Sequence, residues 1–158
     1  MKEFTREDYV HLVEDAYFGN VVSGNLPGIL ECFTEDVRVT IRHGDNPIRQ
    51  FTMDGRDGTT RLEDFYLHLC GNFTPWFGEF EHYIDLPAQR CASTFVVKLS
   101  PLEDSDYSEA GPQTLRNCNF FKCRDGRIEE MIIYYSNYES GMTQSPTGYP
   151  KQGWQAEG

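Results

Sequence analysis

Three polar side chains interrupt apolar stretches of the sequence, and their types suit acid–base or hydrogen-bonding chemistry. His82 alternates in phase with Phe80 and Ile84, so it is predicted to face the interior. Asn117 and Asn119 fall on the apolar face of a later predicted strand. A buried polar group without a partner costs on the order of 1–3 kcal/mol. These side chains therefore either satisfy one another or bind a ligand.

Two histidines are candidates for proton transfer. His82 suits a general acid or base because imidazole titrates near neutral pH and burial tunes it. The alternative is a core histidine bonded to a backbone carbonyl or a carboxylate. His43 follows a predicted strand and precedes Gly44 and Asp45. It is either a solvated loop histidine or, together with Asp45, a second choice of base.

Aromatic side chains supply the remaining candidates. Tyr17 lies on the apolar stripe of the first predicted helix, where its phenol either has an ordinary core partner or stabilises a developing enolate oxygen. The predicted substrate-binding residues are polar or aromatic and come from several strands: His43, Trp76, Asn117, Phe121 and Tyr134. The aromatic members of this set equally suit a core or a dimer face.

Signatures of other chemistries are missing from the sequence. It has no HExxH, EF-hand or paired Cys/His spacing for a metal, no glycine-rich nucleotide motif and no GxSxG. No metal and no cofactor are therefore expected. What remains is chemistry that side chains perform alone, namely proton transfer, dehydration or cyclisation, or simple binding.

The elements that must position these residues begin with helices. Thr5 and Asp8 are spaced as a helix cap, and an apolar stripe at 3–4 spacing predicts a helix that ends near Ser23. A short helix over about 26–33 and a strand over 37–42 follow. A second short strand is expected around 50–53. A further helix runs from 59 or 60 to about 70, with Thr60 and Glu63 spaced as a capping box.

The second half of the chain is predicted to be β-structure. Alternating patterns predict strands over 80–86, 91–99, 115–123 and 128–137. Asp125-Gly126 is the hairpin signal between the last two. Early helices and a late antiparallel meander make an α+β arrangement, in which a curved sheet wraps one long helix and leaves an open, cone-like end for a small molecule. Residues 138–158 are expected to be an irregular tail or an arm on a partner.

Composition excludes several partners. The chain has 158 residues, which suits one domain, and its net charge of −11 argues against nucleic acid and against anionic membrane surfaces. No apolar run is long enough for a membrane span. Five cysteines without a CxxC pair, and an N-terminus without a signal peptide, favour reduced thiols in a cytoplasmic protein.

Three stretches, in order, resemble the nuclear transport factor 2-like superfamily, in particular its ketosteroid isomerase-like and SnoaL-like polyketide cyclase branch. They are GNLPGILECFTEDVRVTI at 24–41, GTTRLEDFY at 58–66 and NFFKCRDGRIEEMIIYYS at 119–136. The resemblance covers about 6–137. It implies a single domain over 1–137 with a cone-shaped α+β barrel of cystatin-like topology, and a homodimer paired through outer sheet faces.

The resemblance also suggests roles for individual residues. Tyr17 matches the oxyanion-hole tyrosine of the steroid isomerases, and Asn119 matches an acidic residue that both branches use. An asparagine keeps a hydrogen-bond donor there but removes an acid or base. The isomerase base position holds Ile41, which cannot take a proton. The base must then come from elsewhere, with His82 as the first choice.

These observations lead to two hypotheses. In the first, the protein is a cofactor-independent isomerase, cyclase or dehydratase for a small apolar carbonyl compound, with His82, Tyr17 and Asn119 as catalytic residues. In the second, the same fold is a non-catalytic module that binds a small molecule or another protein. An aromatic-filled cone favours the second hypothesis.

Overall fold

The computed structural model describes residues 3–43 and 46–136 of the chain. The helices are α1 (Arg6–Val10), η1 (His11–Phe18), α2 (Gly19–Ser23), α3 (Leu26–Leu30), α4 (Leu62–Asn72) and the short η2 (Ser108–Ala110). The strands are β1 (Phe33–His43), β2 (Arg49–Thr52), β3 (Thr60–Arg61), β4 (Phe73–Asp85), β5 (Arg90–Pro101), β6 (Gln113–Arg124) and β7 (Arg127–Tyr135). The predicted α+β order is confirmed.

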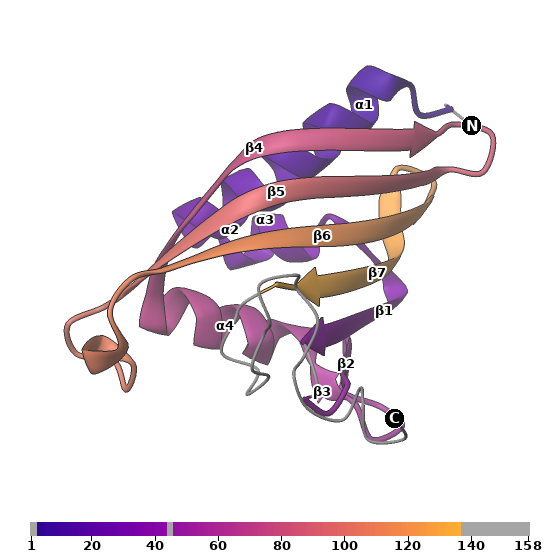
Figure 1. Ribbon diagram of the computed structural model, residues 1–158. Coiled ribbons are helices and arrows are strands. Elements are labelled where there is room, and N and C mark those ends of the chain that lie inside the picture. The colour runs from indigo at the N-terminus through magenta and orange to yellow at the C-terminus, as the bar shows by residue number, and fades with distance from the viewer. Residues whose placement is uncertain (1–2, 44–45, 137–158) are drawn as a thin grey trace, which may run out of the picture.

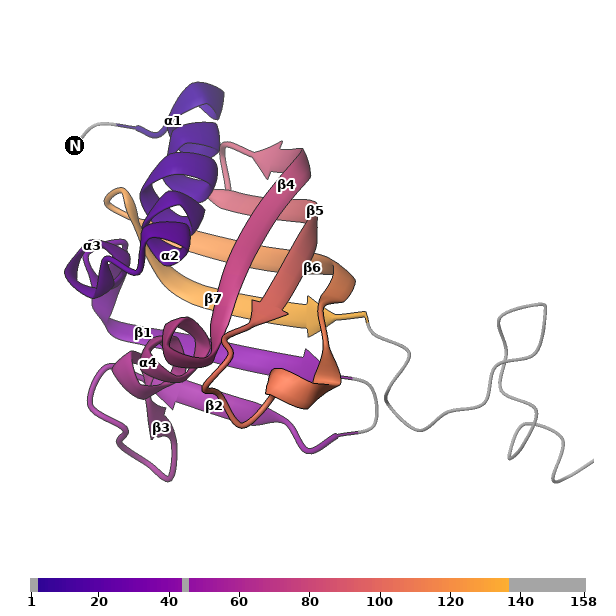
Figure 2. The ribbon, with the colours of Figure 1, turned by 90° about the vertical axis from the view of Figure 1, so that its left-hand side faces the viewer.

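The strands form one mixed sheet in the order β3-β2-β1-β7-β6-β5-β4. The pairs β1–β7 and β2–β3 are parallel, and the other four neighbouring pairs are antiparallel. Figures 1 and 2 show the sheet curving around the N-terminal helix, with α4 beside the β1 end. The result is the expected cone, with the apolar core between helices and sheet.

The N-terminal helix is continuous through α1, η1 and α2. Thr5 and Asp8 form the expected reciprocal cap, since the Asp8 amide donates to the Thr5 hydroxyl and the Thr5 amide donates to the Asp8 carboxylate. Gly24 ends the helix in a left-handed conformation. The middle segment η1 is wider than an α-helix, because the Gly19 amide donates to the Glu14 carbonyl five residues earlier.

Within the antiparallel half of the sheet, β5 and β6 follow the alternation in the sequence. The inward residues predicted for β6 are buried: Leu115, Asn117, Asn119, Phe121 and Cys123. Asp125 and Gly126 both have positive φ, as a two-residue type I′ hairpin requires.

Several details differ from the sequence-based expectations. Thr60 does not cap α4, because it lies in β3, and Arg61 occupies the cap position without a side-chain bond. The alternation over 80–86 predicts that Leu86 faces inward in phase with Ile84, but Leu86 is exposed beyond the end of β4. The short helix α3 ends at Leu30 because β1 already begins at Phe33.

The predicted tail 138–158 and the turn residues Gly44 and Asp45 lie outside the described residues. Within the described ranges, no helix is long and apolar enough to cross a membrane.

Candidate functional site

A small cavity lies inside the cone, between the N-terminal helix, α4 and strands β4 to β7. Its volume is about 40 Å³, which is room for water or for a few heavy atoms. Most of its wall is apolar and includes Phe18 and Phe95. The polar side chains in the wall are Tyr17, Tyr66, Asn117, Asn119 and Tyr135. Two of the three predicted catalytic residues, Tyr17 and Asn119, therefore line one cavity.

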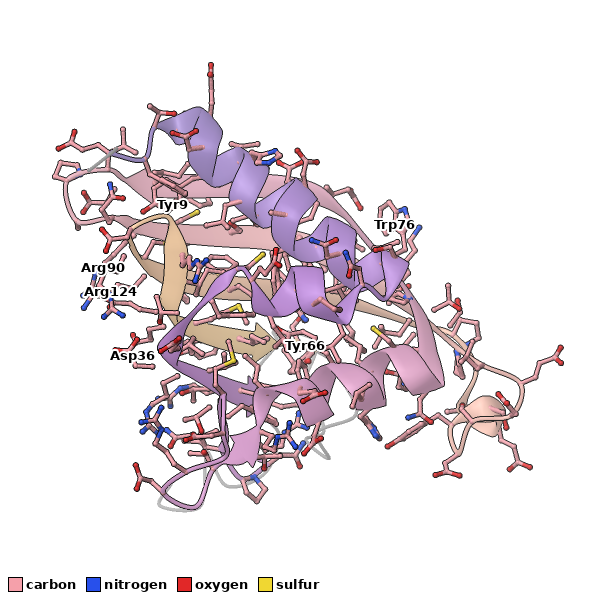
Figure 3. All side chains as sticks on the ribbon, turned by 180° about the vertical axis from the view of Figure 1, so that it is seen from behind. Tyr9, Asp36, Tyr66, Trp76, Arg90 and Arg124 are labelled. Carbon is pink, nitrogen blue, oxygen red and sulfur yellow. The ribbon has the colours of Figure 1, made fainter. Side chains whose placement is uncertain are left out.

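Tyr17 is paired with a second buried phenol. The hydroxyl oxygens of Tyr17 and Tyr66 are 2.7 Å apart, and both side chains are buried. Figure 3 shows Tyr66 in the middle of the molecule between α3 and α4. Burial raises the pKa of both phenols above the ordinary value of 10, and burial likewise raises the pKa of Tyr135. These groups stay protonated at neutral pH and act as hydrogen-bond donors.

The two inward asparagines differ in how well they are satisfied. Asn117 Oδ1 accepts a bond from the Ser136 amide at 3.3 Å. Asn119 Nδ2 donates to Met131 Sδ at 3.7 Å, whereas Asn119 Oδ1 is buried without a partner. A thioether sulfur only accepts hydrogen bonds, so it fixes the amide with its NH₂ group toward Met131. The oxygen of Asn119, rather than a free N–H, is therefore the unsatisfied atom.

His82 lies next to the cavity wall but does not line it. Its Nε2 is 2.6 Å from Glu14 Oε2, and its Nδ1 is 2.7 Å from Ser93 Oγ. The side chain is 5% exposed and stacks on Phe80, whereas the Glu14 side chain is 35% exposed. Since a carboxylate only accepts, Nε2 carries a proton and a neutral His82 accepts the Ser93 hydroxyl at Nδ1.

Strand register connects this triad to the cavity. His82 pairs with Ser93 across β4–β5, and Ser93 pairs with Asn119 across β5–β6. Directly opposite side chains in antiparallel strands are neighbours on the same face. A polar row, Glu14–His82–Ser93–Asn119, therefore crosses the inner face of the sheet from a partly exposed carboxylate to the cavity wall.

Two predicted substrate-binding residues lie away from the cavity. Trp76 is 45% exposed, with Lys98 Nζ 4.7 Å from its ring centre, and Figure 3 shows it at the edge of the molecule. Tyr134 is also exposed and packs against Phe120. These positions correct the expectation that both rings contact a ligand inside the cone.

β-Bulges explain both misplacements. A bulge between Gly78 and Glu81 in β4 reverses the alternation, so Phe77 faces inward in place of Trp76. A register shift at the start of β7 does the same, and Tyr135 lines the cavity in place of Tyr134. Each bulge moves the neighbouring side chain to the other face of the sheet.

The other two predicted contact residues flank the site. The His43 ring packs on Tyr135 with ring centres 5.2 Å apart, and His43 does not line the cavity. Phe121 is buried, and its ring packs edge-on against the Tyr17 ring with ring centres 6.2 Å apart. It therefore contacts Tyr17 without lining the cavity. Both residues therefore pack against tyrosines that line the cavity, and neither lines the cavity itself.

Sequence reasoning missed Glu14 and Tyr66 as site residues. Glu14 precedes Tyr17 by three residues in the helix, and an inward His82 needs an acidic partner, which is the signal that points to it. Tyr66 lies on the apolar stripe of its helix, as Tyr17 does. Only the fold brings the two phenols together, because 49 residues separate them.

The cavity wall is electrically neutral. Among the described residues, no Asp, Glu, His, Lys or Arg lines the cavity, and no group of three or more His, Cys, Asp or Glu is placed to hold a metal. Such a site donates hydrogen bonds from phenols and accepts them at Asn119, with His82 as the nearest group of the polar row that exchanges protons. It can polarise a carbonyl group in apolar surroundings, where hydrogen bonds are strong.

Comparisons with known proteins agree with this fold. A family model described as SnoaL-like domain matches residues 15–131, which is more than half of the chain. No curated protein matches the sequence.

Solved structures match over most of their length. A candidate polyketide cyclase from Xanthomonas campestris pv. campestris has 19% identity and a TM-score of 0.62, with 83% of this chain and 92% of that chain covered. SalBIII, an epoxide hydrolase/cyclase-like enzyme with a role in pyran ring formation in the polyether salinomycin, has 14% identity and a TM-score of 0.61. The match covers 82% of this chain and 92% of that chain. A protein of unknown function with a cystatin-like fold from Methylobium petroleophilum PM1 has 10% identity and a TM-score of 0.61, with 99% and 93% covered. The fold is therefore cystatin-like.

Proposed function

The chain belongs to the SnoaL-like domain family, and from that premise we propose that it is a cofactor-independent enzyme for a small apolar carbonyl compound. The reaction type is isomerisation, cyclisation or dehydration, which share the formation of an enol or enolate. The observation that carries this proposal is the buried Tyr17–Tyr66 hydroxyl pair, 2.7 Å apart, in the wall of a neutral cavity.

The phenol pair supplies the electrostatic part of the mechanism. A substrate carbonyl accepts a hydrogen bond from Tyr17, whose hydroxyl Tyr66 holds in place. As the enolate forms, negative charge grows on that oxygen and the bond strengthens. Loss of one such donor costs on the order of 10²–10³ in rate. Because the Asn119 N–H group faces Met131, the proposal leaves oxyanion stabilisation to the tyrosines.

Proton transfer in this proposal runs through the polar row. Ser93 is buried beside Asn119 and does not line the cavity, so this step requires the wall to open there. The carbon next to the carbonyl then loses a proton to Ser93 Oγ while the Ser93 hydroxyl proton passes to His82 Nδ1, 2.7 Å away. The carbon–hydrogen electron pair becomes the enolate, and Glu14 stabilises the imidazolium at 2.6 Å. Partial exposure of Glu14 lets the proton leave to water.

The volume of the cavity limits the substrate. About 40 Å³ holds a few heavy atoms, so a larger substrate requires the rim side chains to move. Phe65, Leu69 and Phe77 form part of this rim and are only partly buried.

A non-catalytic binding module is the second candidate. It is favoured by the cluster of Phe18, Phe77 and Phe95, whose ring centres lie 4.4 to 6.1 Å apart and fill much of the cone. It is also favoured by the neutral wall, in which no described side chain is a ready base.

Exchange of hydrogen for deuterium separates the two candidates. Small ketones are incubated with the protein in D₂O, and loss of the proton signal next to the carbonyl is followed by NMR. An enzyme accelerates this exchange above a control with free imidazole, and Tyr17→Phe lowers the rate about 10²–10³-fold. Binding without accelerated exchange assigns the non-catalytic function.

We also propose that the chain forms a homodimer through the outer face of its sheet. A shallow groove of about 490 Å³ on that face is lined by residues from β4 to β7. Tyr83, Phe120 and Tyr134 are 60%, 47% and 41% exposed there, which is unusual for large rings on a free surface. The net charge of −11 argues against a nucleic acid or an anionic membrane as the partner.

A further inference from the structure

We infer that the cavity is built for an uncharged β-hydroxyketone, whose carbonyl meets the Tyr17–Tyr66 pair and whose hydroxyl meets Asn119 Oδ1. This inference rests on the proposed function and narrows its substrate class. It depends on three features of the wall: a free acceptor, a donor pair on a different element, and the absence of charge among the described lining residues.

The free acceptor is Asn119 Oδ1. The side chain is 1% exposed, and this oxygen has no hydrogen-bond partner. Met131 Sδ holds the other end of the amide, so the group does not simply turn over to hide its oxygen. A buried acceptor left empty costs on the order of 1–3 kcal/mol, and a ligand with a donor hydroxyl removes that cost. A plain ketone has no donor and leaves the cost in place.

The donor pair lies on the helical side of the cavity. Two hydroxyl groups share one bond between Tyr17 and Tyr66, so one of the two O–H groups remains for a ligand. Tyr17 comes from the N-terminal helix and Tyr66 from α4, whereas Asn119 comes from β6. A ligand that satisfies both groups therefore carries an acceptor for the phenol and a donor for Asn119.

The neutral wall excludes charged ligands. A carboxylate or an ammonium group inside this cavity would lose its hydration without a counter-charge from any described lining residue. Hydroxy acids and amino ketones are therefore disfavoured, even where their size suits the space. A β-hydroxyketone of six heavy atoms exceeds the volume of about 40 Å³, so its binding requires the rim side chains to move.

Binding by calorimetry or ligand-observed NMR tests this inference with four probes. They are 4-hydroxy-2-butanone, its methyl ether 4-methoxy-2-butanone, 2-butanone and 3-hydroxybutanoate. We expect the hydroxyketone to bind about tenfold more tightly than 2-butanone, and expect the ether and the acid to lose that advantage. The methyl ether keeps the acceptor oxygens, removes the donor and adds one carbon, whereas 2-butanone lacks the donor without that added carbon, so the two comparisons together need no variant.

A variant then tests whether Asn119 causes the preference for the hydroxyketone over 2-butanone. Asn119→Leu removes the acceptor and keeps the branching of the side chain, although it is larger than Asn. We expect this variant to bind both ketones equally, with a circular dichroism melt to verify folding. Equal affinity of the wild-type protein for the hydroxyketone and 2-butanone, no binding of either, or tighter binding of the ether or the acid overturns the inference. A preference that persists in folded Asn119→Leu also overturns it.

Failure of this inference is distinct from failure of the proposed function. If deuterium exchange is accelerated equally for 2-butanone and the hydroxyketone, the enzyme stands and the ligand class is wrong. If the hydroxyketone binds selectively without accelerated exchange, the ligand class stands and the catalytic proposal is wrong.

Discussion

Hydrogen-bond partners decide what the inward polar residues of this protein can do. His82 is held at both ring nitrogens, by Glu14 at 2.6 Å and Ser93 at 2.7 Å, so its ring has one fixed orientation. Asn119 is held only at its nitrogen and keeps an empty oxygen. In the proposed function the first residue relays a proton, and in the further inference the second receives a hydroxyl group.

Two histidine–carboxylate pairs, each with its carboxylate on the N-terminal helix, allow a matched test of burial. His82→Ala removes the partner of the Ser93 hydroxyl, and we expect the free energy of unfolding to fall by about 1–3 kcal/mol. His11→Ala breaks a pair with Asp15 at 3.0 Å in which both side chains are 71% exposed, and we expect a change within about 0.5 kcal/mol. Urea denaturation measures both. Similar losses for the two variants would contradict the structural role given to His82.

The buried phenols predict how stability responds to alkali. Burial raises the pKa of Tyr17 and Tyr66 in the folded protein above the unfolded value of 10. Their contribution is therefore complete below pH 10 and is lost as the pH rises above it, when only the unfolded chain ionises. Each such group steepens the decline by up to about 1.4 kcal/mol per pH unit.

The variant Tyr17→Phe/Tyr66→Phe tests this directly. Both partners are replaced by rings of the same shape, so we expect little change in unfolding free energy at pH 7. Between pH 10 and 11 the double variant should lose stability more slowly than the wild type, as measured by urea denaturation at each pH. Parallel declines would mean that these phenols already ionise in the folded state.

The sequence pointed to some of these residues and not to others. His82, Asn117 and Asn119 stood out because polar types at inward positions need partners, and Tyr17 because a phenol lay on an apolar stripe. Tyr66 gave no such signal, since an aromatic residue on an apolar stripe is ordinarily core. Glu14 was indicated only indirectly, because an inward His82 needs an acidic partner. Glu14 and Tyr66 meet their partners through contacts between segments that are distant in the sequence. The periodicity of a sequence carries no information on such contacts.

At the scale of elements, alternation predicts a strand well but does not predict where it is interrupted. The β5 and β6 faces follow the pattern without a break, whereas β4 and β7 contain register shifts. Because of those shifts, Phe77 and Tyr135 line the cavity, whereas Trp76 and Tyr134 are exposed. The turn at Asp125-Gly126 was predictable because few residues adopt positive φ at two successive positions.

Two glycines test this account of the turn. Gly126 has a φ of +79°, and a Cβ there would lie 2.8 Å from Phe4 Cε1, so we expect Gly126→Ala to destabilise the fold by more than about 1 kcal/mol. Gly71 lies in α4 with open space around it, so we expect Gly71→Ala to be neutral or stabilising by up to about 1 kcal/mol. Thermal unfolding of both variants compares them. Equal melting temperatures would show that the hairpin is not strained by a side chain.

At the scale of the whole molecule, the two faces of the sheet have different tasks. The inner face curves around the N-terminal helix (Figure 2) and contributes to the cavity wall. Tyr83, Phe120 and Tyr134, from β4, β6 and β7, are exposed. The general fold was predictable because three stretches resembled known relatives in the right order. Cavity volume was not, since it depends on how Phe18, Phe77 and Phe95 pack together.

Outer-face pairing predicts a sensitive position at Phe120. This ring is 47% exposed and packs on Tyr134 in the same chain, with ring centres 5.8 Å apart. We expect Phe120→Arg to shift the protein from dimer to monomer in sedimentation velocity, because a symmetric contact brings the two new charges together. Leu67→Arg, on the exposed side of α4, is the control and should leave the dimer intact. A monomeric wild type, or a dimeric Phe120→Arg, would place the interface elsewhere.

The infrared carbonyl stretch of a bound ketone tests most directly whether the Tyr17–Tyr66 pair polarises a carbonyl group. The difference spectrum between the ¹²C- and ¹³C-carbonyl forms of 4-hydroxy-2-butanone separates this band from the protein amides. If Tyr17 donates a hydrogen bond to the carbonyl oxygen, the stretching frequency of the bound ligand is lower than that of the same ligand in an apolar solvent. In Tyr17→Phe the frequency returns toward the value in that solvent. A bound band that is the same in the wild type and in Tyr17→Phe would contradict this role of Tyr17.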